Sequence, residues 1–116
     1  MKLTFFTGLK KVEALTQLSE LELTGNPKKS LEYAKRSLKL AKELNDPSAI
    51  VAGHLNHGDA YLELGQFSKS IPHFSSALTI CENYFNEPGK AYCYLKIGLA
   101  YRNMGSYKKA KKHLNS

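Results

Sequence analysis

Apolar residues recur every three or four positions along most of the chain, which is the spacing of one face of an α-helix. The clearest case is the stretch 51–84, where Gly58 and Tyr61 share one face of a predicted helix. Gly65 follows that helix and is expected to end it as a left-handed cap residue. Phe67 then starts the return, and Phe74 lies on the apolar face of a second helix. The stretch therefore predicts two antiparallel helices joined by a short turn.

This two-helix pattern returns 40 positions later along the chain. The equivalent pairs are Gly58/Gly98, Tyr61/Tyr101, Gly65/Gly105, Phe67/Tyr107, Ser70/Ala110 and Phe74/Leu114. A weaker copy comes first, in which residues 25–27 stand in the place of residues 65–67. A fixed period of this length is typical of stacked helical units. We therefore expect three units, of which the first is atypical.

The helices themselves are predicted from their start and stop signals. Asp46 as N-cap followed by Pro47 is a strong start, and Thr7 is a weaker one. Gly105 is expected to end the fifth helix, so that a sixth starts near Ser106. The predicted helices span about 7–24, 28–44, 47–64, 68–84, 88–104 and 106–116. They form a single domain, 1–116, with repeats at about 8–46, 47–86 and 87–116, the last helix being truncated.

The order of small and aromatic residues in each unit resembles the tetratricopeptide repeat. The residues that carry the resemblance are Gly58, Tyr61, Gly65, Phe67, Ser70, Phe74 and Ala77, and in the third unit Gly98, Tyr101, Gly105, Tyr107 and Ala110. The resemblance implies an all-α, right-handed solenoid of three helical hairpins, about six helices, in a variant with a 40-residue period. HEAT-like repeats also run near this length, but the residue order favours the tetratricopeptide family.

The resemblance also implies a non-catalytic protein-interaction module, which binds a peptide or a partner helix in a concave groove. Its lining would come from the first helix of each unit. These residues are Leu15, Ser19 and Glu22; Leu55, Asn56, Asp59, Leu62 and Glu63; Tyr92, Leu95, Lys96, Leu99, Arg102 and Asn103. They form an apolar floor with acidic and basic borders, which suits an amphipathic or extended segment. The module would act as a scaffold or as part of a larger regulator.

Some members of the family bind the C-terminal tail of a chaperone through Lys and Asn at set groove positions. Leu15 and Ser19 stand at the first pair of those positions in this sequence, so we do not expect that ligand. The short last helix leaves two readings open. Either the chain is a piece of a longer protein, or another chain, for example a second copy, covers the uncapped C-terminal end.

The formal net charge is +7, which leaves open an acidic partner, and a nucleic acid is one such partner. The positive residues lie on predicted second helices, which face the convex side: Lys28, Lys29, Lys35, Arg36, Lys39 and Lys42, then Lys108, Lys109, Lys111 and Lys112. Aromatic residues for base stacking are not interleaved with them. A solvated basic face is therefore the simpler interpretation, and nucleic-acid binding is the alternative function.

The sequence contains few residues that could form a catalytic or metal-binding site. His54, His57 and Asp59 are close enough on one helix to suggest a metal, but both histidines stand where the repeat packs its helices, and a zinc site needs three or four ligands. Cys81 and Cys93 stand at packing positions. We find no phosphate loop, nucleophile elbow or zinc-protease motif. We therefore expect no enzyme activity, no metal and no cofactor, and a cytoplasmic protein without a membrane span.

Overall fold

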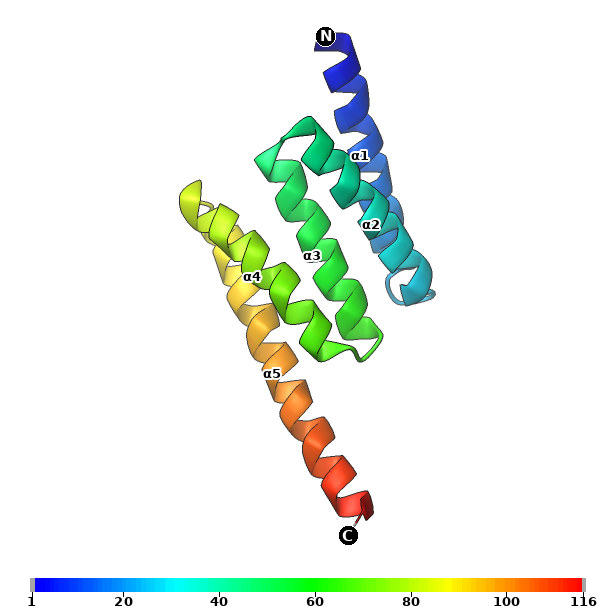
Figure 1. Cartoon of the computed structure of the whole chain (residues 1–116), viewed down its shortest axis with the longest axis vertical. Helices are drawn as coiled ribbons and strands as arrows, with labels where there is room; N and C mark the ends of the chain where they lie inside the picture. Colours follow the sequence, from blue (N-terminus) through cyan, green and yellow to red (C-terminus); the bar gives the residue numbers. More distant parts are fainter. Residues whose placement is uncertain (1, 116) are drawn as a thin grey trace.

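The structure, a computed structural model, describes residues 2–115, and within that range it contains five α-helices and no strand. The helices are α1 (Lys2–Glu22), α2 (Pro27–Leu44), α3 (Pro47–Glu63), α4 (Phe67–Asn83) and α5 (Glu87–Asn115) (Figure 1). Each helix packs against the next one in sequence, and α3 also contacts α1 and α5. The predicted all-α stack of antiparallel hairpins is therefore confirmed.

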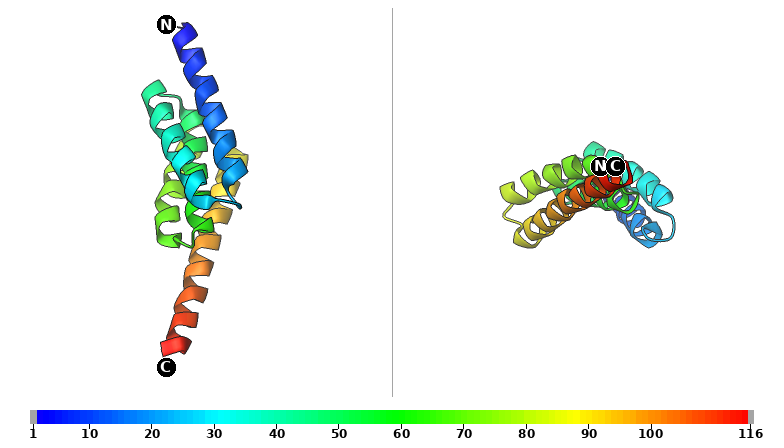
Figure 2. Two further views of the ribbon diagram at one scale, coloured as in Figure 1. Left: turned by 90° about the vertical axis from the view of Figure 1, so that its right-hand side faces the viewer. Right: turned by 90° about the horizontal axis from the view of Figure 1, so that it is seen from below.

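The stack is curved, and this curvature gives it two different faces. Seen along its long axis, it forms an arch with α2 and α4 on the outer side and α1 and α5 on the inner side (Figure 2). The molecule measures 62 × 30 × 18 Å. The first helices of the hairpins therefore line the concave face, as the resemblance implied.

Side-chain caps begin three of the helices. Asn26, Asp46 and Asn86 each accept a hydrogen bond from the backbone N–H three residues later, over 3.2, 3.0 and 3.0 Å. Pro27 and Pro47 occupy the first helical positions, where a missing N–H costs nothing. The start signals predicted at Pro27 and at Asp46 with Pro47 are confirmed.

Close packing and a tight turn define the central hairpin, α3–α4. A Cβ built on Gly58 would lie 2.5 Å from Cζ of Phe74, so only glycine fits beneath that ring. Gly65 has a φ of +73°, the left-handed conformation predicted for the residue that ends α3. The buried side of the hairpin is completed by Ala60 and Ala77, which are fully enclosed.

The third hairpin does not form, which corrects the sequence prediction. α5 runs through Gly105 and continues to Asn115 as one helix of 29 residues, so the sixth helix predicted from Ser106 is absent from the described chain. A glycine inside a helix costs only about 1 kcal/mol, whereas a turn breaks several helical hydrogen bonds. After Gly65, the free energy lost with these hydrogen bonds is recovered because the following residues pack on α3. The Lys-rich stretch after Gly105 offers less apolar surface for such packing.

The start of the first helix is a second correction. α1 begins at Lys2, five residues before the predicted cap at Thr7. No proline or glycine interrupts residues 2–7, so nothing local stops the helix from extending toward the N-terminus. Gly8 instead lies inside α1, where it faces the side chain of Leu44 at the end of α2.

Candidate functional site

The predicted groove residues fall into three classes of exposure on the inner helices α1, α3 and α5. Four are exposed: Glu63, Tyr92, Leu95 and Arg102. Six are half-buried: Glu22, Leu55, Leu62, Lys96, Leu99 and Asn103. The remaining four are buried: Leu15, Ser19, Asn56 and Asp59. The accessible part of the set therefore comes mainly from α3 and α5.

The α1 residues Leu15 and Ser19 are enclosed by their neighbours. The Ser19 hydroxyl donates to the Ser30 carbonyl over 2.9 Å, and the Ser30 hydroxyl donates back to the Ser19 carbonyl over 2.6 Å. These reciprocal bonds join α1 to α2. Ser19 therefore faces the interface between the two helices. The sequence could not show this, because a small polar residue can lie either in an interface or on a groove.

Asp59 of α3 is the polar centre of the concave face. Its Oδ2 accepts a hydrogen bond from the Tyr92 hydroxyl over 2.5 Å, and its Oδ1 lies 3.2 Å from the Lys96 Nζ. The Lys96 ammonium also lies 5.1 Å from the centre of the Tyr92 ring. Two α5 side chains therefore hold one α3 carboxylate, and the sequence had assigned all three to the groove without pairing them.

The two oxygens of this carboxylate are not equally satisfied. Oδ1 of Asp59 is buried and has no aligned hydrogen bond, because the approach of Lys96 is close in distance but poor in direction. Burial, the hydrogen bond to Asp59 and its charge all raise the pKa of Tyr92, with Glu20 adding to the effect. Tyr92 is therefore a neutral donor at physiological pH.

Four leucines of the predicted groove lie on α3 and α5, the two helices that the Asp59 carboxylate joins. Leu95 is 61% exposed, while Leu55, Leu62 and Leu99 are half-buried. Leu55 also packs against the core cluster that contains Val51. Leu95 is therefore the most accessible of the four, and its exposed side chain suits contact with the apolar face of another segment.

A second polar contact joins two of the inner helices, α3 and α1. The Asn56 side-chain amide donates to the Thr16 carbonyl over 3.4 Å, which links α3 to α1. Asn56 is buried, so it serves this contact and not a ligand. On the concave face, Asn56 therefore links α3 to α1 and Asp59 links α3 to α5.

Histidines fill part of the interface between α3 and α4. His54 and His73 share a hydrogen bond between their Nδ1 atoms over 3.0 Å, and the His57 ring stacks on His73 with 4.2 Å between centroids. The predicted packing role of His54 and His57 is confirmed. Their partner His73 was not singled out, although its position beside Phe74 on the predicted second helix was a signal.

Burial makes these histidines weak bases. Burial, then the charges of His73 and Lys42, lower the pKa of His54 to about 4. Burial and four positive neighbours, led by His73, lower the pKa of His57 to about 3. Neither ring nitrogen of His57 has a hydrogen-bond partner. In the part of the chain that the structure describes, no three His, Cys, Asp or Glu residues form a metal-binding group.

The outer face of α2 is basic and contains an aromatic side chain. Lys29 Nζ and the Arg36 guanidinium each lie 6.0 Å from the centre of the Tyr33 ring. The expectation that no aromatic is interleaved with these basic residues is therefore wrong, because Tyr33 lies one helical turn from both. Lys28, Lys35, Lys39 and Lys42 are also exposed on this helix.

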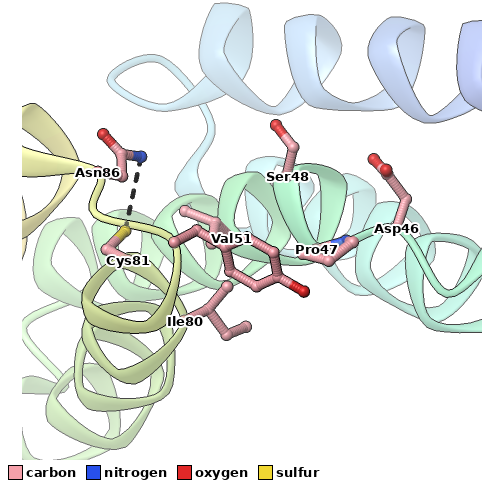
Figure 3. Close-up of a pocket in the computed structure, with 8 residues that line it drawn as sticks. Asp46, Pro47, Ser48, Val51, Ile80, Cys81 and Asn86 are labelled. Atoms are coloured by element: carbon pink, nitrogen blue, oxygen red, sulfur yellow. Dashed lines mark hydrogen bonds between the residues drawn. The ribbon is translucent and has the colours of Figure 1, made fainter.

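A hollow of about 340 Å³ lies apart from the groove, where the start of α3 meets the end of α4 (Figure 3). Its lining includes Val51, Ile80 and Cys81, with Asp46 and Asn86 at its border. The Asn86 amide, 3.7 Å from the Cys81 sulfur, also caps α5. Because the Asn86 side chain already makes hydrogen bonds to Cys81 and to the start of α5, the hollow offers few free polar groups to a ligand.

The two cysteines are buried and reduced. Cys81 and Cys93 are 1% and 0% exposed, so their predicted packing role is confirmed. Burial, with the neighbouring Cys81, raises the pKa of Cys93 to about 11. That thiol stays protonated at neutral pH, which is the opposite of what a nucleophile requires. No helix in the described part of the chain is long and apolar enough to cross a membrane.

Comparisons with known proteins agree with this geometry. A family described as Tetratricopeptide repeat matches residues 49–116. Among solved structures, the crystal structure of the TPR domain of Arabidopsis FLU is similar, with a TM-score of 0.79 and 22% sequence identity over 93% of this chain and 92% of that one. At that identity the likeness concerns the fold. A comparison with curated protein sequences finds no match.

Proposed function

We propose that this chain, which belongs to the tetratricopeptide repeat family, is a non-catalytic module that binds a peptide or a helix of a partner protein in its concave groove. The fold is generally one of protein–protein interaction. The binding surface would be the accessible part of α3 and α5. The protein would act as a cytoplasmic scaffold or as one part of a larger regulator.

Leu95 is the observation that carries this proposal. It is 61% exposed on α5, one helical turn from the half-buried Leu99 of the same helix. Exposing a leucine costs free energy, which contact with a partner's apolar side chains would recover. An amphipathic helix or extended segment presents such side chains at regular spacing.

Charge limits which segments fit the groove. Asp59 and Lys96 neutralise each other, so the exposed Glu63 on α3 and Arg102 on α5 are left to set register. They lie on different helices, one acidic and one basic. A partner segment with an apolar stripe and one charge of each sign would complement this surface.

The test compares two leucine substitutions in a capture experiment. The immobilised chain is incubated with nuclease-treated host lysate, in parallel with Leu95→Glu and Leu21→Glu. Leu21 is 78% exposed on α1, outside the predicted groove, so both variants should fold, as circular dichroism would show. The proposal expects proteins that are retained by the wild type and by Leu21→Glu but lost with Leu95→Glu. Equal retention by all three would overturn it.

The second candidate function is nucleic-acid binding by the outer face of α2. Tyr33 between Lys29 and Arg36 favours it, because a base can stack on a ring while cations meet phosphates. Lys35→Glu with Lys39→Glu should then weaken binding of a single-stranded oligonucleotide and make the remaining binding less dependent on salt concentration. Unchanged oligonucleotide binding, or none by the wild type, would exclude this face.

A further inference from the structure

Two tyrosines of α5 lie on a side of the helix that no other helix of the described chain covers. Tyr94 and Tyr101 are 58% and 59% exposed, and α5 contacts only α3 and α4 within the described residues. On α3, Gly58 lies against the Phe74 ring of α4. Its equivalent on α5, 40 positions on, is Gly98, where a Cβ would meet nothing within 4 Å. α5 therefore has the residues of a helix-packing surface without a packed helix.

The two tyrosines share this side of α5 with two open glycines and one charge of each sign. Successive residues of an α-helix differ in direction by about 100°, so residues three, four or seven positions apart lie on the same side. A Cβ built on either glycine would meet nothing within 4 Å, and both charged residues are exposed. We call this side the tyrosine face. Its residues, which fall within about 60° around the helix axis, are Glu87, Tyr94, Gly98, Tyr101, Gly105 and Lys112.

The tyrosine face is complementary in shape to a second copy of itself that runs in the opposite direction. Gly98 and Tyr101 are equally far from the point between positions 99 and 100, and so are Tyr94 and Gly105. When two such faces pack antiparallel about a two-fold axis at this point, each ring meets a glycine of the other helix. A ring packed on a glycine is also the contact that joins α3 to α4. Large and small residues therefore interlock along the whole face.

The charges of the tyrosine face fit the same arrangement. Glu87 and Lys112 are also equally far from the point between positions 99 and 100, so each Glu87 faces Lys112 of the other copy. The Glu87 side chain is 74% exposed, and its ion pair with Lys90, at 3.4 Å, is a weak surface pair. A parallel pair of helices would instead place like charges together at both ends. Charge therefore favours the antiparallel arrangement.

The straight course of α5 makes the whole tyrosine face available to another molecule. Residues 106–112 continue the helix past the turn between α3 and α4, as the red end of α5 shows (Figure 1). In the antiparallel arrangement this end lies beside the start of the other α5. The two helices then overlap from 87 to 112, over about 37 Å.

We propose that the tyrosine face is a dimer interface, in which two copies of this chain pack their α5 helices antiparallel. Tyr101 of each copy covers Gly98 of the other, and Tyr94 covers Gly105. The same surface serves both subunits, as a two-fold axis requires. Leu95 lies about 90° away from the middle of the tyrosine face around α5. Its side chain is therefore left to a partner protein, and the dimer presents two grooves.

Oligomeric state gives the first test. Sedimentation of the wild type at about 100 µM should show a dimer that dissociates on dilution. Gly98→Leu fills the space that the other copy's Tyr101 ring needs, while the single chain has open space there. This variant should therefore fold, as circular dichroism would show, and sediment as a monomer. The matched control, Ser76→Leu on the exposed side of α4, should remain a dimer. Leu95→Glu should also remain a dimer, which keeps this test separate from that of the groove.

A monomeric wild type, or a folded Gly98→Leu that stays dimeric, would overturn the proposal. Two cysteine variants test the antiparallel register. Glu87→Cys and Lys112→Cys place a thiol at opposite ends of the tyrosine face, about 37 Å apart along the helix. Oxidation should link two chains in an equal mixture of the two variants, but not in either variant alone. Linked chains in one variant alone, or none in the mixture, would contradict this register.

Discussion

The Tyr92 hydroxyl donates a hydrogen bond to Oδ2 of Asp59 over 2.5 Å, and this bond links α5 to α3 across the concave face. The two helices have little other contact, because α4 lies between them on the outer side. The same carboxylate is 3.2 Å from Lys96. This small group of side chains therefore contributes both to the curvature of the arch and to the floor of the proposed groove.

Removing the Tyr92 hydroxyl should weaken the fold. Tyr92→Phe leaves Oδ2 of Asp59 without its donor, and an unpaired, mostly buried carboxylate oxygen costs about 1–3 kcal/mol. The measurement is the free energy of unfolding in urea. Tyr94→Phe, at an exposed position of the same helix, is the control and should change stability by less than about 0.5 kcal/mol. Equal effects would mean that the hydrogen bond contributes little.

The contact of Gly58 with Phe74 predicts a coupled pair of substitutions. Gly58→Ala places a methyl group against the Phe74 ring and should cost about 1–3 kcal/mol of stability through overpacking, despite the better helix propensity of alanine. Phe74→Leu frees space above the same position. The double variant should therefore lose less stability than the two single variants combined. Strict additivity in urea unfolding would show that the ring can move aside freely.

The buried histidines predict a loss of stability in mild acid. The pKa of His54 is lowered to about 4 and that of His57 to about 3, so the unfolded chain binds more protons than the folded one below about pH 6.5. Stability should therefore fall as the pH drops from about 6.5 toward 4. Lys35 and Lys42 of α2 and His73 of α4 face this group and strengthen the effect.

Urea unfolding at about pH 7.5 and pH 5 measures this dependence. We expect each of the two histidines to cost the wild type up to about 2 kcal/mol between the two conditions. In His57→Phe the ring stays but its proton site is removed, and neither His57 nitrogen has a partner to lose. That variant should lose less stability over the same interval. A wild type equally stable at both values would contradict the burial of these rings.

Much of the fold could be predicted because its signals are local. Asp46 with Pro47 starts a helix wherever the cap geometry is available, and Gly65 ends one because it adopts a positive φ easily. The repeat of Gly58 and Tyr61 identified the hairpin. Gly105 has the same local sequence signal as Gly65, yet the helix continues. A turn there depends on what the following residues can pack against, which local sequence does not contain.

The exposure of the predicted groove residues could not be predicted from the sequence, for a similar reason. Leu95 and Arg102 are exposed, because helical spacing and the curvature of the stack together set their direction. Ser19 is instead bonded to Ser30, and Asp59 is held by Tyr92 and Lys96. Which hydrogen bonds Ser19 and Asp59 make depends on the distances between helices and on which side chains of the neighbouring helix lie opposite them. The periodicity of one helix does not specify either.

Hydrogen–deuterium exchange of the chain with a captured partner tests the central claim most directly. The account predicts slower exchange in the peptides that cover 55–63 and 92–103, on the concave sides of α3 and α5. The peptides of the outer helix α2, 28–42, should exchange at the rate of the free chain. Protection of 28–42 with no change in 55–63 and 92–103 would contradict the concave groove as the binding surface.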